Sequence, residues 1–332
     1  MTQSAAPDIP LDLTPESFWA VVLRRTRYVV AVIISGLIFH YLGWLTAAPP
    51  PNMAGVSLVA WGTAGPAYSG ILAALSLAAL LVVATVLCSI VIHPDSPHMG
   101  LFCALLGSLA LSIRGGDVRM LYQFAADNGI YPQISRMLAL ECVHWAFIFL
   151  IAEIVARVFH NQFLVNTHWL KRGGVDLTES LPRVPGESAS LGIANAVAKS
   201  IGTLKMTRAV ATPIAFIANV ALASLFLYVF LQTPIKGQVI FGCFAAFFLS
   251  THLVYYAFPN VPVSVLLLSV PLTAAIGYLL SANQMPHYPG LPGLFFGRAL
   301  PIDYIGAGIP GAILGFYLAF QWDLHSRLEP DA

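Results

Sequence analysis

The chain has 332 residues, of which 58% are hydrophobic and only 9% are charged, whereas an ordinary soluble domain is about 25% charged. This composition excludes a globule surrounded by water. The net charge of +1 offers no basic field for binding nucleic acid. We therefore expect an integral membrane protein whose main partner is the lipid bilayer, and we expect no nucleic-acid partner.

The cysteines and the first residues narrow the class further. The four cysteines lie inside apolar runs and form no C-x-x-C pair, so they are interpreted as small core residues, and we expect no metal and no cofactor. The first 27 residues are polar and include Asp8, Asp12 and Glu16, unlike the start of a signal peptide, and the apolar run that follows is longer than the 7–15 residues of a signal peptide's hydrophobic region. We expect an uncleaved membrane anchor.

Seven apolar runs have the roughly 17–25 residues that a helix needs to cross a bilayer. They cover residues 28–47, 69–92, 138–159, 209–231, 238–258, 262–281 and 304–322. An eighth run, 99–113, is short for a span and could instead be re-entrant. Whether it crosses decides on which side of the membrane every later loop lies.

The positive-inside rule favours a crossing. With eight spans and cytoplasmic termini, eleven of the sixteen Lys and Arg residues lie inside; with seven spans, only eight of them do. The short run can lengthen over Pro97 and His98 or lie in a locally thin bilayer. We predict an all-α polytopic transmembrane helix bundle of about eight spans in the plasma (inner) membrane, with both termini cytoplasmic.

This topology divides the chain into five parts. Residues 1–27 form a cytoplasmic segment with an interfacial helix that begins near Thr14, and spans 1–4 occupy 28–159. Residues 160–208 form a cytoplasmic linker whose apolar positions predict an amphipathic helix over 193–208. Spans 5–8 occupy 209–322, and 323–332 form a cytoplasmic tail. The aromatic, turn-rich loop 285–297 is expected to fold as a compact cap at the interface.

Ionisable residues inside spans are functional candidates by default, and the fourth span carries most of them. Glu141-Cys142-Val143-His144 has the spacing of ligands in di-iron bundles, but no other span carries a glutamate. A di-metal site is therefore not expected. We interpret Glu141 as lying near the external interface, where its carboxylate reaches water or pairs with Arg136.

Glu153 lies on the same predicted helix but on a different face. Nine residues at 100° each place it half a turn away from His144, so the two side chains cannot form one relay. Arg157 follows Glu153 by four residues, which predicts an ion pair near the cytoplasmic interface.

The other membrane histidines are His40 and His252. Haem would require a single bridge between His40 and His144, and a lone intramembrane histidine more often forms a hydrogen bond to a neighbouring helix.

Two charge clusters are predicted to lie outside. One contains Arg114 and Arg119, and the other contains Arg298 and Asp303, at the start of the last span. Such arginines are expected to contact lipid phosphate; the alternative is that they gate an anionic substrate.

The last two spans are interrupted by small residues and prolines. Pro271 lies in the middle of the seventh span, and Gly311 and Gly315 form a G-x-x-x-G motif in the eighth. The motif predicts close helix packing; the alternative is a binding site at a discontinuous helix.

The sequence thus favours a non-catalytic multi-pass protein, either a subunit of a membrane complex or a small-solute transporter, with the subunit slightly ahead. The alternative is a membrane-embedded enzyme acting on lipid-linked or acyl substrates, with His144 or His252 as base and Arg114 or Arg119 holding phosphate. The candidate substrate-binding residues are Glu153, His144, His252, Pro271, Gly311, Arg114 and Arg119.

Overall fold

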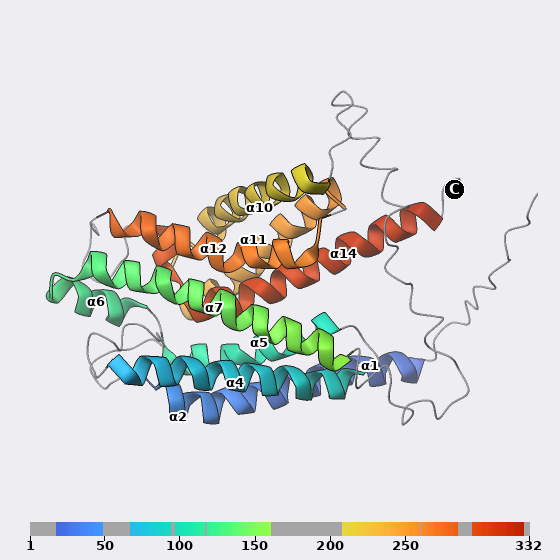
Figure 1. The fold of residues 1–332 in the computed structure, drawn as a ribbon, viewed down its shortest axis with the longest axis horizontal. Helices are drawn as coiled ribbons and strands as arrows, with labels where there is room; N and C mark the ends of the chain where they lie inside the picture. The colour runs from blue at the N-terminus through green and yellow to red at the C-terminus, as the bar shows by residue number, and fades with distance from the viewer. Residues whose placement is uncertain are drawn as a thin grey trace, which may run out of the picture.

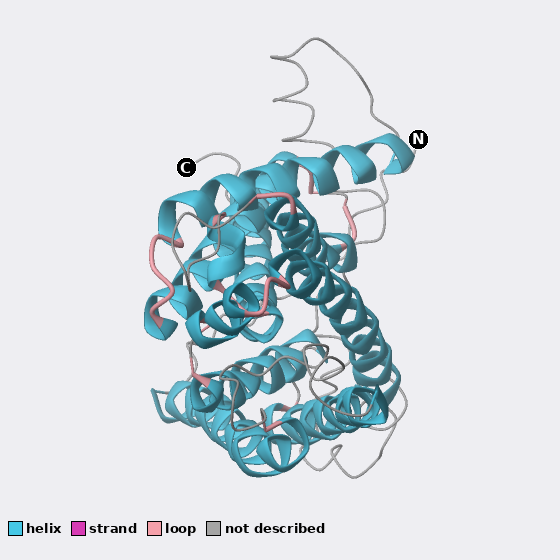
Figure 2. Cartoon of the chain, turned by 90° about the vertical axis from the view of Figure 1, so that its left-hand side faces the viewer, coloured by secondary structure: helices cyan, strands magenta, loops and turns pink. Residues whose placement is uncertain are grey.

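The computed structural model describes residues 18–48, 67–93, 97–116, 118–160, 208–259, 261–284 and 294–328. All regular structure within these residues is helical (Figure 2). Eight of the described helices are long and apolar enough to cross a membrane, and one of them is His98–Gly115. The all-α, eight-span architecture is therefore confirmed, whereas the side on which each terminus lies stays a prediction.

The first three spans form one group (Figure 1). Helix α1 (Phe18–Ile38) continues through a π-helical turn, η1 (Phe39–Gly43), into α2 (Trp44–Ala47). Helix α4 (Ala67–Ile92) and helix α5 (Pro97–Gly115) pack against α1 and against each other. The extension of the short span over Pro97 and His98 is confirmed, since α5 begins at Pro97. Proline suits a first helical position because it has no N–H to leave unpaired.

A short amphipathic helix then leads into the longest span. Helix α6 (Arg119–Asp127) lies between two glycines with positive φ, Gly116 at 79° and Gly129 at 66°, where only glycine avoids the steric cost of a left-handed turn. Helix α7 (Tyr131–Phe159) begins seven residues before the predicted start at residue 138. It packs against α4 and α5 on one side and against α12 on the other.

The last four spans complete the bundle. They are α10 (Arg208–Phe230), α11 (Lys236–Ala257), α12 (Val263–Ala282) and the helical run η4 (Phe295–Arg298), α13 (Pro301–Asp303), η5 (Tyr304–Gly308) and α14 (Ile309–Leu328). Helices α7 and α14 lie between the first group and the α10–α12 group (Figure 1). The last span is the central one. In it, 78% of an apolar 18-residue stretch is buried, compared with 22% of the corresponding stretches of the first and fifth spans.

Small residues allow α11 and α14 to pack closely. A Cβ atom at Gly311 would lie 2.3 Å from the carbonyl oxygen of Phe244, and one at Gly315 would lie 2.3 Å from that of Phe248. The G-x-x-x-G motif therefore brings two backbones into contact, as its spacing predicts.

Some sequence predictions concern residues outside those described. They include the helix start near Thr14, the amphipathic helix over 193–208 and most of the 285–297 loop. In the described end of that loop, Phe296 is 7% exposed and packs onto Gly277, where a Cβ atom would meet its ring. At the other end of the chain, α1 runs through residue 27 without a break.

Candidate functional site

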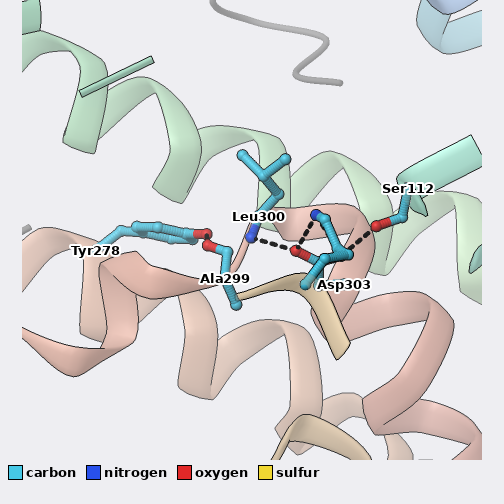
Figure 3. A network of polar contacts seen from close by, with 6 residues as sticks. Ser112, Tyr278, Ala299, Leu300 and Asp303 are labelled. Atoms are coloured by element: carbon cyan, nitrogen blue, oxygen red, sulfur yellow. Dashed lines mark hydrogen bonds and ion pairs between the residues drawn. The ribbon is translucent and has the colours of Figure 1, made fainter. Parts of the chain in front are cut away.

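The first polar cluster surrounds Asp303, at the end of the bundle predicted to be external (Figure 3). Its carboxylate is 1% exposed and lies 3.1 and 3.0 Å from Nζ of Lys236. The Ser112 hydroxyl donates to Oδ1, and the Leu300 N–H donates to Oδ2 over 2.8 Å. The cluster thus ties the end of α5, the start of α11 and the start of the last span together.

Local sequence explains the position of Asp303. Pro301 starts α13, and Asp303 at the third position reaches back to the free N–H of Leu300, which is where an acid stabilises a helix start. We expected Arg298 and Asp303 to lie together at the membrane interface. This prediction is wrong for Asp303, because the packing of three helices buries its carboxylate.

Arg298 is also bound by the protein itself. Its guanidinium donates to the carbonyl oxygen of Leu231 over 2.9 Å and to that of Gln232. Arg298 thus binds the carbonyl oxygens of the two residues that follow α10, and its contact with lipid phosphate stays a prediction.

Two buried tyrosines attach the segment before α13 to the bundle. The Tyr278 hydroxyl donates to the carbonyl oxygen of Ala299 (Figure 3), and the Tyr304 hydroxyl donates to that of Phe296 over 2.9 Å. Both side chains are fully buried. These bonds satisfy the carbonyls of Phe296 and Ala299 inside the bundle, as buried irregular backbone in a membrane protein requires.

The second polar cluster surrounds Glu153 at the opposite end. Arg157 donates to Oε1 of Glu153 over 2.5 Å, and the Ser264 hydroxyl donates to the same atom over 2.9 Å. Nδ1 of His98 lies 4.0 Å from it. The predicted ion pair between Glu153 and Arg157 is confirmed, and the structure adds α5 and α12 to it.

His144 and Glu153 point in different directions, as the half-turn separation predicts. Glu153 is 4% exposed, whereas His144 lies on the exposed face of α7. Nδ1 of His144 lies 2.8 Å from the carbonyl oxygen of Leu140, one turn earlier. His144 is the fourteenth of the 29 residues of α7, so it lies near the middle of that helix.

The interpretation of Glu141 as a water-exposed carboxylate is wrong. Glu141 is 1% exposed, and Nε1 of Trp145 donates to its Oε1 over 3.4 Å. Arg136 is exposed on α7, and five residues at 100° each place it about 140° away from Glu141 around the helix. The side of α7 that carries Glu141 packs into the bundle rather than facing the interface.

Arg114 stabilises an irregular turn of the first span. Its Nη1 donates to the carbonyl oxygen of His40 over 2.7 Å, and its guanidinium lies 4.4 Å from the ring centroid of Trp44. His40 lies in the π-helical turn, which shifts backbone hydrogen bonds out of the α pattern. Arg119 is exposed at the first position of α6.

The remaining candidates lie in separate places. Nδ1 of His252 lies 3.3 Å from the carbonyl oxygen of Gly315, and its ring meets Trp322 edge to face at 5.2 Å. Pro271 is buried inside α12, and the Cβ direction of Gly311 is filled by α11. The structure therefore does not gather the seven candidate residues into one site.

A third polar cluster lies between the two charged ones and was not predicted from the sequence. Asn219 of α10 is fully buried and donates through Nδ2 to Ser269 Oγ over 2.7 Å and to the carbonyl oxygen of Leu266 over 3.3 Å. Its Oδ1 atom and Oγ1 of Thr273 have no hydrogen-bond partner among the described residues.

The sequence did contain signals for these missed residues. Asn219 is an amide in the middle of a predicted span, and Lys236 precedes a span with no acid nearby in sequence. Polar residues at such positions require partners. Their partners lie 32 to 67 residues away in the chain, so spacing could not identify them.

No protein-family profile, curated protein or solved structure matches this chain.

Proposed function

We propose that the chain is a non-catalytic subunit of a membrane complex. The observation that carries this proposal is the position of His144, an ionisable side chain halfway along a spanning helix and on the exposed face of that helix. Polar groups at this depth are costly in lipid and normally face a bundle interior or a partner. A neighbouring membrane protein at this face would remove that cost.

The other charged groups near or within the spans support the same function. Glu153 and Asp303 are each bound by residues from other helices of the chain. The catalytic alternative needs one of His144 and His252 close to Arg114 or Arg119. His144 lies against the carbonyl oxygen of Leu140 and His252 against that of Gly315, whereas Arg114 donates to that of His40. The geometry therefore favours assembly over catalysis.

The native mass of the full chain tests the subunit role. The protein is extracted from its own membranes in mild detergent, and its mass is measured by light scattering corrected for detergent. A particle heavier than one chain that contains a second protein in fixed stoichiometry supports the proposal. A clean single chain without a partner contradicts it.

Small-solute transport is a second candidate. It is favoured by the side-chain oxygens of Asn219 and Thr273, for which the described part of the chain offers no hydrogen-bond partner. Buried polar atoms without partners are rare, and an internal water or polar solute would satisfy them. Transport predicts that Thr273→Cys in membrane vesicles reacts with a small water-soluble thiol reagent, with the unmodified chain as control. Complete protection from both sides of the membrane argues against a solute path here.

A further inference from the structure

The exposed face of α7 is an apolar stripe with one polar residue at its centre. Its apolar members are between 47% and 63% exposed. They are Leu140, Phe147, Ile151, Ile154 and Val158. His144 lies between Leu140 and Phe147. Within the described part of α7, this stripe faces away from α4, α5 and α12.

The hydrogen bond of His144 fixes the chemistry that it offers. A carbonyl oxygen only accepts, so the 2.8 Å contact with Leu140 means that Nδ1 carries a proton and donates it. In the neutral ring, Nε2 then carries a lone pair and no proton. No described residue donates a hydrogen bond to Nε2, and acyl chains have no donor to offer.

The stripe has the spacing of a helix-packing seam. Its residues are alternately four and three positions apart, from Leu140 through His144 and Phe147 to Val158, which matches the core positions of left-handed helix pairs. The large side chains exclude the close right-handed crossing that glycine motifs make. A single polar residue in such a seam fixes the register of the partner helix.

From these observations we propose that the α7 stripe binds one transmembrane helix of a different protein, and that this helix donates a hydrogen bond to Nε2 of His144. The donor is a Ser or Thr hydroxyl, an Asn or Gln amide, or a Trp indole. A second copy of the chain does not fit, because symmetrical packing would place two Nε2 lone pairs against each other. This inference rests on the proposed subunit role and names the surface and the chemistry of the partner.

A photo-crosslinking experiment tests the inference in native membranes. A benzophenone amino acid replaces Ile151 in the full chain, and as a matched control it replaces Ile217, which is 65% exposed on α10. Each is combined with native His144, with His144→Leu and with His144→Gln. The Leu side chain removes the acceptor, whereas the Gln side-chain oxygen retains one. His144 is exposed, so neither change disturbs packing inside the chain.

The expected result has three parts. Position 151 cross-links to a transmembrane helix of another protein that has one of the named donors within one turn of the equivalent depth. His144→Leu lowers the yield of that adduct about 3- to 20-fold, the range expected for one interhelical hydrogen bond. His144→Gln restores it to within about twofold, and adducts at position 217 do not change.

Three results overturn the inference: adducts at 151 with lipid alone, adducts with a second copy of the chain, or an unchanged yield in His144→Leu. If the native mass shows a complex while position 151 gives only lipid adducts, the subunit role stands and the α7 surface is wrong. If the native mass is that of a single chain, the subunit role itself fails.

Discussion

Replacing Lys236 with Met tests whether the buried ion pair stabilises the bundle. The change removes the ammonium but keeps most of the apolar stem, so packing is largely preserved. Of the donors that the structure describes, it leaves the Asp303 carboxylate, which is 1% exposed, with the Ser112 hydroxyl and the Leu300 N–H. An uncompensated buried charge is among the few causes of large destabilisation.

The structure sets the size of the effect. At a separation of 3.0 Å, two unit charges attract by on the order of 5 kcal/mol at an effective dielectric constant of about 20. The Lys236 side chain is 16% exposed, so part of this attraction is screened. We expect Lys236→Met to lower the free energy of unfolding by about 3 kcal/mol.

Removing the charge of the other partner, Asp303, is expected to lower the free energy of unfolding by less. Asp303→Asn keeps an acceptor for Ser112 or Leu300, and the long Lys236 stem can turn its ammonium toward water, so the expected loss is about 1 kcal/mol. The double variant removes both charges and is expected to be close to Asp303→Asn, which gives a coupling of about 2–3 kcal/mol.

Unfolding can be followed with a thiol-reactive dye, because all four cysteines are buried in the folded chain. Reversible unfolding in mixed micelles then gives the free-energy differences. If Lys236→Met is no more destabilising than Asp303→Asn, or if the two losses simply add, the ion pair does not contribute as argued.

Three further predictions concern packing, the π-helical turn and topology. Gly311→Ala places a Cβ atom against the Phe244 carbonyl oxygen and should lower the free energy of unfolding by about 2–3 kcal/mol in the same dye assay. Its control is Gly237→Ala, which has nothing within 4 Å of the added atom and should be neutral or slightly stabilising. Arg114→Met removes the hydrogen bond to His40 and the contact with Trp44, and should cost about 1–2 kcal/mol; an unchanged unfolding midpoint would contradict the capping role. A membrane-impermeant thiol reagent added to intact cells should label Asp127→Cys and not Arg25→Cys; the opposite pattern would invert the predicted topology.

The sequence predicts the spans well because hydropathy and length decide whether a helix can cross a bilayer. The third span is the instructive case. Its apolar run is too short when considered alone, and the distribution of Lys and Arg residues indicates a crossing. The structure shows why the short run suffices, since the helix begins at Pro97 and ends at Gly115.

The polar clusters were predictable only where both partners lie on one helix. Glu153 and Arg157 are four residues apart, and helical spacing brings them together. Asp303 meets Lys236 across 67 residues and Ser112 across 191, so the tertiary packing of separate spans decides these contacts. The expected exposure of Glu141 failed for a related reason, because the start of α7 and its rotation toward the bundle are set by its neighbours.

The range of these hydrogen bonds also distinguishes the roles of the ionisable residues. Asp303 and Glu153 each accept from residues more than 60 positions away, so their polarity contributes directly to holding separate helices together. The hydrogen bond of His144 reaches back only four residues along its own helix. It joins no two elements of the chain, and an apolar side chain would fit the same exposed position at lower cost in lipid. Among the described residues, His144 thus connects no two helices, and the donor that we propose on a helix of another protein would explain why this position is polar.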